Sequence, residues 1–537
     1  MTYKTFGVML DVSRNGVMKV AQVKKYIDYL AKMGYNALEL YAEDTYAIEG
    51  EPHFGYLRGA YTSAELKEID AYAKEKGVEL IPCVQTLAHF TNVRKLPKYG
   101  HLFDIDDILL IDSEEVYEFL DKMFASLAEN FTSRQVNIGM DEAHNVGLGR
   151  HLDKYGYENR SEMLVRHLNR VSEIAKKYGF TCHMWSDMFF RLINNGEYYL
   201  TEETKNVKVS AEIAAKVPEN VALTYWDYYS TEKELYDLMF DKHFEFGKDV
   251  WFAGGAWAWQ GFAPLNKFSL KSMRIAMQSV AEKGVQNVMM TVWGDDGKEC
   301  SFFSILPALY AIRQFADGNF DMDDIKATFK EKFGFIFDEW LTLDLPTEIY
   351  VNGKQDDKWN CLCATMCYTD PFMGLRDLEY AALDPIPFDE FAEKIAKCAD
   401  NAGEFSYVFD VVAKMCRFLA LKAPMGLKTR AAYQKGDKAA LVALVKEYGE
   451  AVLRLDTFTK AYRAQWMKEN KAFGWEVQEL RLGGVRARLL NCAERLQAYL
   501  DGELDEIEEL EIELLPNLDR NGFMYHRYRE IVSASEV

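Results

Sequence analysis

The pattern of apolar and polar positions divides the chain into two parts. Up to about residue 318, short apolar runs alternate with longer stretches in which apolar residues recur every three or four positions. Short runs predict buried strands and the longer stretches predict amphipathic helices, so their alternation predicts strand and helix units around a parallel sheet. The predicted strands are residues 6–12, 36–42, 78–84, 135–141, 181–185, 221–226, 249–255 and 287–293.

Helix boundary signals support these units. Segments 62–65 (TSAE) and 231–234 (TEKE) have the sequence of capping boxes, and glycines stand where helices should end, at Gly34, Gly77, Gly179, Gly247 and Gly284. Eight successive units in roughly 300 residues are typical of a (β/α)8 TIM barrel. A doubly wound sheet usually carries a glycine-rich phosphate turn after its first strand, and the turn here, DVSRNG (11–16), lacks that pattern.

After residue 318 the pattern changes to long helical stretches. Three of them, at 389–423, 438–470 and 474–504, predict helices, whereas 350–360 is predicted to be an irregular loop. We therefore predict an α/β chain with two domains. We expect residues 1–318 to form the (β/α)8 barrel, which would carry any catalytic site, and residues 319–537 to form an all-α C-terminal domain.

Composition narrows the range of partners. The chain has 537 residues with 84 acidic and 63 basic side chains, a formal net charge of −21. Nucleic acids and anionic membranes would be repelled at long range, so neither is an expected partner. The N-terminal sequence lacks a signal peptide's apolar region, and no run approaches the ~18 apolar residues that span a bilayer. A soluble cytoplasmic protein is the simplest interpretation.

The nine cysteines are scattered rather than dense, which favours reduced thiols over a disulfide scaffold. The cluster CLCATMC (361–367) matches no common zinc spacing. HNVGLGRH (144–151) spaces its histidines seven apart, and no H-E-x-x-H is present. We predict buried thiols, no metal site and no cofactor.

The ends of the predicted strands carry the candidate chemistry, because TIM barrels place their active sites at the C-terminal ends of the strands. Each of the last four strands ends in or near a tryptophan. One tryptophan is as often core as pocket wall, but the repetition predicts an aromatic pocket with carboxylates, typical of a sugar-binding site. The strand-end residues are Asp11, Arg14, Tyr41, Glu43, Asp44, His89, Asp141, Glu142, Trp185, Asp187, Trp226, Asp227, Trp257, Trp259, Trp293 and Asp295.

Asp141 and Glu142 are adjacent, which restricts how they could act together. Retaining glycosidases ordinarily place two carboxyls ~5 to 5.5 Å apart on opposite sides of the sugar, which neighbours in sequence do not easily achieve. They could serve a reaction in which the substrate's own 2-acetamido group attacks the anomeric carbon. Asp141 would then orient the acetamide, and Glu142 would protonate the leaving oxygen. Neighbouring carboxyls resist ionising together, so one stays charged while the other stays an acid.

The segment NIGMDEAH (137–144) resembles the [HN]-x-G-x-D-E signature of glycoside hydrolase family 20, the β-N-acetylhexosaminidases. The resemblance extends to DVSRN, CVQTLAHF, MWSDM, TYWDYY and TVWGDDG at other strand ends. It implies catalytic roles for Asp141 and Glu142. It also implies that Arg14 bonds the 3- and 4-hydroxyls of the terminal sugar, that His89 supports the acid pair, that Trp293 forms the floor, and that Asp295 meets the 4- and 6-hydroxyls. Trp185 and Trp226 occupy matching positions, and we add Trp257 to the predicted substrate-binding residues.

Two positions depart from the family pattern. The eighth strand usually carries W-x-E, whereas this chain has aspartate at 295, with Asp296 and Glu299 nearby. The seventh strand usually ends in Y-x-D, whereas this chain has GGAWAWQGF (254–262). The tyrosine that contacts the acetamide is then Tyr225, Tyr228 or Tyr229, of which we select Tyr228. With its helical C-terminal region, the chain looks like the smaller intracellular bacterial branch.

The resemblance implies an exo-β-N-acetylhexosaminidase that hydrolyses terminal β-linked GlcNAc or GalNAc with retention, through an oxazolinium intermediate. Its partner would be a small oligosaccharide or glycoconjugate with a terminal N-acetylhexosamine. The alternative is a TIM-barrel glycosidase of another family that acts on a non-acetylated sugar through distant carboxylates such as Glu142 and Asp295. A catalytically silent sugar-binding barrel is a third hypothesis. The sequence predicts no oligomeric state.

Overall fold

The computed structural model describes residues 3–201, 203–516 and 527–535. Eight parallel strands pair in sequence order, and β1 also pairs with β8, so the sheet closes into a barrel. The predicted TIM barrel is therefore confirmed, and every predicted strand overlaps one observed strand. The strands are β1 Thr5–Asp11, β2 Ala37–Ala42, β3 Glu79–Val84, β4 Gln135–Asn137, β5 Thr181–Trp185, β6 Val221–Trp226, β7 Val250–Gly255 and β8 Asn287–Val292.

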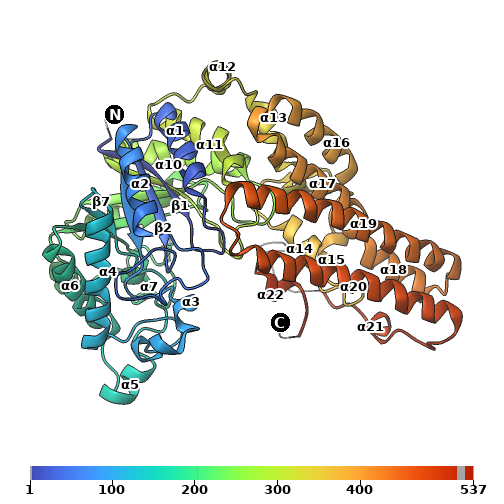
Figure 1. The fold of residues 1–537 in the computed structure, drawn as a ribbon, viewed down its shortest axis with the longest axis horizontal. Helices are drawn as coiled ribbons and strands as arrows, with labels where there is room; N and C mark the ends of the chain where they lie inside the picture. The colour runs from blue at the N-terminus through green and yellow to red at the C-terminus, as the bar shows by residue number, and fades with distance from the viewer. Residues whose placement is uncertain (1–2, 202, 517–526, 536–537) are drawn as a thin grey trace.

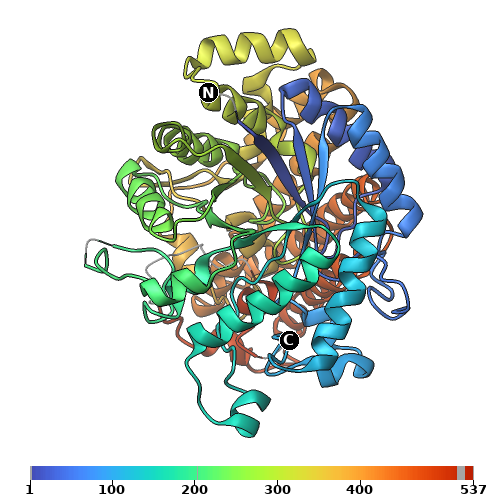
Figure 2. The ribbon, with the colours of Figure 1, turned by 90° about the vertical axis from the view of Figure 1, so that its left-hand side faces the viewer.

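Helices surround the barrel strands on the outside (Figure 2). Their apolar faces pack onto the strands, as Val23, Ile27 and Leu30 of α1 do, and these side chains are fully buried. The helices of this part are α1 Val20–Met33, α2 Ser63–Glu75, α3 Thr91–Arg94, α4 Glu114–Asn130, α5 Arg150–Tyr155, α6 Arg160–Lys177, α7 Asp187–Arg191, α8 Ala211–Lys216, α9 Lys233–Phe244, α10 Asn266–Lys283 and α11 Leu306–Ala316, with 3-10 helices η1 Pro97–Leu102 and η2 Phe302–Ile305.

The boundary signals were correct in most places. The capping box of Thr62 and Glu65 begins α2, and Gly34 and Gly284 end α1 and α10 in the left-handed conformation. The box predicted at 231–234 was wrong. Helix α9 begins at Lys233 after Glu232, whose side chain makes no capping hydrogen bond, so the pattern T-x-x-E there lacks the geometry of a cap.

The C-terminal region is helical, as predicted, and its two longest helices run side by side away from the barrel (Figure 1). Two details differ from the prediction. Stretch 389–423 is broken into two helices by 3-10 turns, and the predicted loop 350–360 contains a hairpin of β9 and β10. The elements are α12 Met322–Phe333, α13 Phe337–Trp340, η3 Leu341–Thr347, β9 Ile349–Val351, β10 Lys354–Asp356, α14 Leu362–Tyr368, α15 Asp377–Ala381, α16 Phe388–Cys398, η4 Ala399–Asn401, η5 Gly403–Phe405, α17 Ser406–Lys422, α18 Met425–Gln434, α19 Lys438–Glu469, α20 Trp475–Asp501, α21 Glu508–Glu511 and α22 Tyr528–Ile531.

The turn between α19 and α20 docks on the loop that follows β1. Lys19 N donates to Glu469 O at 2.9 Å, and Lys471 N donates to Val17 O at 2.8 Å. Gly474 has a φ of 87°, and a Cβ there would lie 2.3 Å from Asn15 O, so only glycine fits this contact. The helical region therefore reaches the end of the barrel at which the strands finish.

The described part of the chain shows neither a membrane-spanning helix nor a metal-binding cluster. Among the described helices, none is long and apolar enough to cross a membrane. Within the described ranges, no group of three or more His, Cys, Asp or Glu side chains is arranged to hold a metal ion. Cys361, Cys363 and Cys367 are buried in and beside α14 and form no disulfide with another described residue, in agreement with the prediction of buried thiols.

Candidate active site

The acid pair lies in a tight turn directly after β4. The predicted strand extended to Asp141, but the observed strand ends at Asn137 because the chain then turns sharply. Gly139, Met140 and Glu142 have φ values of 68°, 74° and 51°. The left-handed conformation costs a residue with a Cβ about 1–2 kcal/mol. Two such residues in one turn are a local strain of the kind found at functional sites.

Side chains from three neighbouring strands hold this turn. The amide of Asn137 accepts from Gly139 N at 3.0 Å, and Gln85 Oε1 after β3 accepts from Met140 N at 3.1 Å. After β5, the Asp187 carboxylate accepts from Glu142 N at 3.2 Å. Sequence reasoning named Asp187 only as a strand-end residue and did not identify Gln85. The only feature of the sequence that points to Asp187 and Gln85 is that each is a polar residue near the end of a predicted strand.

We expect Gly139→Ala to lower the kcat/KM of the reaction catalysed at this site by about 10²-fold, because an ångström of displacement at a catalytic group has that effect. A Cβ at Gly139 would lie 2.1 Å from Gln85 Oε1 and 2.8 Å from Val84 O. The control is Gly156→Ala, where φ is 80° but nothing lies within 4 Å of the new Cβ. Kinetics on both variants, with circular dichroism to check folding, make the measurement. Equal activity in the two variants would contradict the steric explanation.

Asp141 is held in place as a carboxylate. Its side chain is 12% exposed, Gln85 Nε2 donates to Asp141 Oδ1 at 2.8 Å, and His89 Nε2 lies 3.2 Å from Asp141 Oδ2. Burial opposes the negative charge, but His89 and the Gln85 amide outweigh it and lower the pKa of Asp141. Asp141 is therefore an oriented anion inside the cavity.

Glu142 is in a different environment. Its side chain is 43% exposed, and its carboxyl oxygens lie 3.7 Å from His89 Nε2 and 3.7 Å from Arg191 Nη2. These distances exceed those of a hydrogen bond, so the carboxyl is free of a fixed partner within the protein part that is described. The two adjacent acids thus differ in exposure and in restraint, as different chemical roles require.

His89 Nε2 lies within 4 Å of the carboxylates of both Asp141 and Glu142. Burial disfavours its charge, but the Asp141 and Glu142 carboxylates raise the pKa of the imidazole to about 10. Its other ring nitrogen, Nδ1, lies 4.0 Å from Glu43 Oε1. The histidine is therefore a cation at neutral pH that faces three acids.

The pKa of Asp187 is shifted in the opposite direction to the pKa of Asp141. Burial, reinforced by the negative charge of Asp141, raises the pKa of Asp187 to about 7 although Arg191 opposes this. Arg191 Nε donates to Asp187 Oδ2 at 2.8 Å. Arg191, near both Asp187 and Glu142, is not identified from the sequence because it lies in α7 rather than at a strand end.

Arg14 faces the cavity from the loop after β1. Its guanidinium pairs with Asp11 at 3.1 Å and Glu43 at 3.2 Å, and it lies over the rings of Tyr41 and Trp293. Although burial opposes the charge, Glu43 leads the neighbours that raise the pKa of Arg14 well above its usual value. Arg14 is thus a fixed hydrogen-bond donor in the cavity wall.

The cavity around these residues has a volume of about 880 Å³. Most predicted residues lie in its wall, but the fully buried Trp257 does not. Trp257 stacks behind Trp259 with ring centroids 4.3 Å apart, and Trp259 lines the cavity in its place. The barrel part of the wall includes Arg14, Glu43, His89, Asp141, Glu142, Trp185, Trp226, Tyr228, Tyr229, Trp259, Trp293 and Asp295.

The three candidate tyrosines occupy different positions. Tyr225 is fully buried and donates to Asp227 Oδ2 at 2.8 Å, which turns its hydroxyl away from the cavity. Tyr228 and Tyr229 both line the cavity. The Tyr228 ring stacks on Trp226 at 5.4 Å, whereas Tyr229 is 38% exposed. Tyr228 is therefore the better-fixed candidate for contact with a substrate.

The helical region completes the cavity, which the sequence did not predict. Arg481 of α20 pairs with Asp296 at 3.2 Å and Glu299 at 3.4 Å, and Gln478 Nε2 donates to Gly297 O at 2.8 Å. These contacts hold the loop after β8, where Asp295 lies. Val477, Arg481, Arg527 and Arg529 line the cavity from this side.

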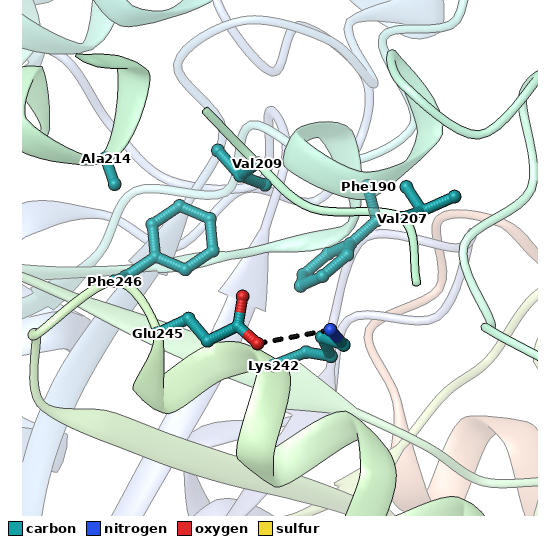
Figure 3. A pocket seen from close by; sticks show the side chains of 7 residues that line it. All are labelled: Phe190, Val207, Val209, Ala214, Lys242, Glu245 and Phe246. Carbon is teal, nitrogen blue, oxygen red and sulfur yellow. Dashed lines mark hydrogen bonds and ion pairs between the residues drawn. The ribbon is translucent and has the colours of Figure 1, made fainter. Parts of the chain in front are cut away.

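A second cavity lies apart from the strand ends, between α7, α8 and α9 (Figure 3). It holds about 10 Å³, which is about the space of one water molecule. Its wall is apolar except for Lys242 and Glu245, which pair at 3.1 Å. It is too small to hold a sugar.

Models of known protein families match both parts of the chain. The model described as the catalytic domain of glycosyl hydrolase family 20 matches residues 3–237. The model described as the glycoside hydrolase 20C C-terminal domain matches residues 338–528. The chain belongs to glycoside hydrolase family 20. It is therefore a glycoside hydrolase, and the helical region is the counterpart of a domain known within family 20.

Individual relatives are distant. Hexosaminidase D of Bos taurus is 23% identical over 313 residues, which cover 55% of this chain and 84% of the bovine protein. Hexosaminidase D of Homo sapiens is 24% identical over 219 residues, which cover 39% of this chain and 42% of the human protein. This chain thus spans less than half the length of the human relative.

Solved structures from family 20 resemble part of the chain. The exo β-N-acetylglucosaminidase from Vibrio harveyi, in complex with N-acetylglucosamine, has a TM-score of 0.47 and 18% identity, over 64% of this chain and 58% of that chain. The β-N-acetylhexosaminidase from Streptomyces coelicolor A3(2) has a TM-score of 0.45 and 20% identity, over 62% of this chain and 70% of that chain.

Proposed function

We propose that this family 20 chain is an exo-acting β-N-acetylhexosaminidase that removes terminal β-linked GlcNAc or GalNAc with retention of configuration. The observation that carries the proposal is the contrast within the adjacent acid pair. Asp141 is buried and held as an anion by His89 and Gln85, while Glu142 is 43% exposed and its carboxyl makes no hydrogen bond with any described residue. One acid suits a positioning role and the other suits proton transfer.

The reaction follows from these environments. The acetamide oxygen of the substrate attacks the anomeric carbon as the bond to the leaving oxygen breaks, and Glu142 donates its proton to that oxygen. Asp141 accepts a hydrogen bond from the acetamide N–H, and its charge stabilises the positive oxazolinium ring that forms. Glu142, now a carboxylate, then takes a proton from the water that opens the ring. Two displacements at one carbon retain the β configuration.

The cavity suits a sugar with an N-acetyl group at its floor. Trp185 and Trp293, with ring centroids 6.1 Å apart, supply apolar faces for the sugar's C–H groups. Arg14 supplies fixed donors for ring hydroxyls, and Asp295 supplies an acceptor after β8. Tyr228 is proposed as the contact of the acetamide. The alternative of a glycosidase from another family is no longer supported, because the chain belongs to family 20.

The proposal is tested by following hydrolysis of 4-nitrophenyl β-GlcNAc with proton NMR. We expect the β anomer of GlcNAc to appear first and the α anomer to appear only as the sugar mutarotates. Initial release of the α anomer would contradict a retaining mechanism. Absence of hydrolysis with both the GlcNAc and the GalNAc glycoside would contradict the proposed activity.

The charge on His89 provides a prediction on pH. The His89 cation lowers the pKa of Asp141, so replacement by neutral asparagine raises that pKa. Asp141 must be ionised to stabilise the oxazolinium ion. We therefore expect the acidic limb of the kcat/KM profile to move to higher pH in His89→Asn, because the variant lacks the positive charge that stabilises the Asp141 carboxylate. The pH profile of kcat/KM measures this, and an acidic limb at the wild-type position would contradict the assigned role.

A further inference from the structure

The helical side of the cavity carries arginines, and they are not equivalent. Arg481 is neutralised by Asp296 and Glu299, as described above. Arg527 reaches its nearest carboxylate, on Glu530, only at 3.9 Å, and its side chain is 55% exposed. Arg529 is exposed and forms no ion pair with any residue in the described part of the chain. The guanidinium groups of Arg527 and Arg529 could therefore form ion pairs with an anionic ligand in the cavity.

The segment that carries these arginines is fixed to the barrel by Tyr528, which lies between them. Tyr528 N donates to Asp296 Oδ2 at 2.7 Å. The Tyr528 ring packs edge-on against Tyr368 at 5.0 Å, and the Arg481 guanidinium lies 4.9 Å from its centroid. Ile531, at the end of α22, is fully buried. The arginines are thus presented on an anchored turn and both line the cavity.

The cavity is larger than one sugar ring requires. Its volume of about 880 Å³ lies near the upper end of the range of roughly 300–1,000 Å³ for small-molecule sites. A terminal sugar over Trp185 and Trp293 occupies the floor. Glu142, which would protonate the leaving oxygen, is 43% exposed, so the leaving group extends toward the open mouth. Arg527 and Arg529 are the exposed arginines of that wall.

Two exposed arginines, one paired only loosely with Glu530 and one without an ion pair among the described residues, stand out on a chain with a net charge of −21. Overall repulsion would keep anions away, and two exposed guanidinium groups in the cavity wall oppose that repulsion locally, which favours an anionic ligand beside them. The planar guanidinium group matches carboxylates and sulfates with paired N–H donors. Neutral sugars would gain little from two such charges.

We propose that Arg527 and Arg529 form a subsite for a negatively charged leaving group, that is, a glycoside whose second sugar or other aglycone carries a carboxylate or a sulfate. The inference rests on the proposed glycosidase function and adds the substrate class. The helical domain then contributes to specificity, in addition to holding the loop after β8.

The test compares two substrates that differ only in charge. The β-GlcNAc glycosides of 3-carboxyumbelliferone and of its neutral 3-carboxamide are hydrolysed at low ionic strength, and the ratio of their kcat/KM values is taken within each variant. Differences in leaving-group reactivity, and any uniform change in activity, cancel when the ratio in a variant is divided by the ratio in the wild type. We expect this preference for the carboxylate to fall about threefold in Arg527→Gln and in Arg529→Gln, and about tenfold in the double variant, as for exposed ion pairs.

The matched control is Arg463→Gln. Arg463 is exposed on α19, outside the cavity wall, and forms no ion pair among the described residues, so its replacement removes one positive charge elsewhere. The control should keep the wild-type ratio, and the ratio in the wild type should fall as salt is added. The proposal would be overturned if the carboxylate-to-carboxamide ratio fell equally in Arg463→Gln and in the test variants. It would also be overturned if neither Arg527→Gln nor Arg529→Gln changed that ratio.

A third substrate places the anion on the terminal sugar instead. The kcat/KM for 4-methylumbelliferyl 6-sulfo-β-GlcNAc is divided by that for its unsulfated form in each variant. If this ratio falls in the arginine variants while the ratio for the carboxylated leaving group does not, the assignment to the leaving group is overturned. Failure of the proposed function is distinguishable, because it would abolish hydrolysis of the neutral glycoside by the wild-type enzyme.

Discussion

Glu142→Gln is expected to lower kcat/KM on a β-GlcNAc disaccharide by about 10³- to 10⁴-fold, the upper part of the range for loss of a general acid. Glutamine has nearly the shape of protonated glutamate but has no proton to give to the leaving oxygen. Because the Glu142 side chain is 43% exposed and its oxygens lie 3.7 Å from their nearest partners, the substitution breaks no hydrogen bond of the fold.

The dependence on the leaving group identifies the role. A 2,4-dinitrophenyl glycoside departs without protonation, so the defect of Glu142→Gln should shrink strongly on that substrate. Glu115→Gln, at an exposed position on the outer face of α4, serves as the control for loss of one acid. Wild-type turnover of the disaccharide by Glu142→Gln would contradict the proposed role.

Asp141→Asn should cost about 10³-fold in kcat, comparable with the loss of a group that stabilises charge in a transition state. Asparagine keeps the shape but removes the charge that faces the oxazolinium ion. It also leaves His89 without the carboxylate 3.2 Å from its Nε2. Steady-state kinetics on the series of leaving groups used for Glu142 measure the effect.

The two variants should respond differently to that series. Formation of the oxazolinium ion needs Asp141 whatever the leaving group, so the defect of Asp141→Asn should persist with 2,4-dinitrophenolate. A full recovery on that substrate would show that Asp141 acts on the leaving group, which is against the proposal. This contrast separates positioning of the nucleophile from donation of the proton.

Much of the barrel could be predicted from the sequence, because each of its units carries local signals. Apolar runs located all eight strands, and their polar ends located Asp141, Glu142, Arg14 and His89, which the structure brings around one cavity. Local pattern was insufficient where the chain departs from regular geometry. The strand after residue 135 ends early because the left-handed turn at Gly139 is stabilised by residues from other strands.

The parts that could not be predicted depend on contacts between distant segments. Trp257 and Trp259 are two residues apart in a run of similar character, and only packing decides that Trp259 faces the cavity. Arg481 reaches the loop after β8 from 182 residues away along the chain, measured to Glu299. A contact between residues so far apart in the chain leaves no periodic pattern in the sequence from which it could be predicted. The cytoplasmic location and the domain boundary at residue 318 stay predictions.

The central claim is that the substrate's acetamide is the nucleophile and that Asp141 holds it. Inhibition by GlcNAc-thiazoline, a stable mimic of the cyclised intermediate, tests this most directly in the wild type and in both acid variants. We predict competitive inhibition of the wild type with an inhibition constant at least about 10²-fold below KM, as for transition-state mimics. Tight binding should survive in Glu142→Gln and be lost in Asp141→Asn. Absence of inhibition in an active wild-type enzyme, or equal binding by Asp141→Asn, would contradict the account.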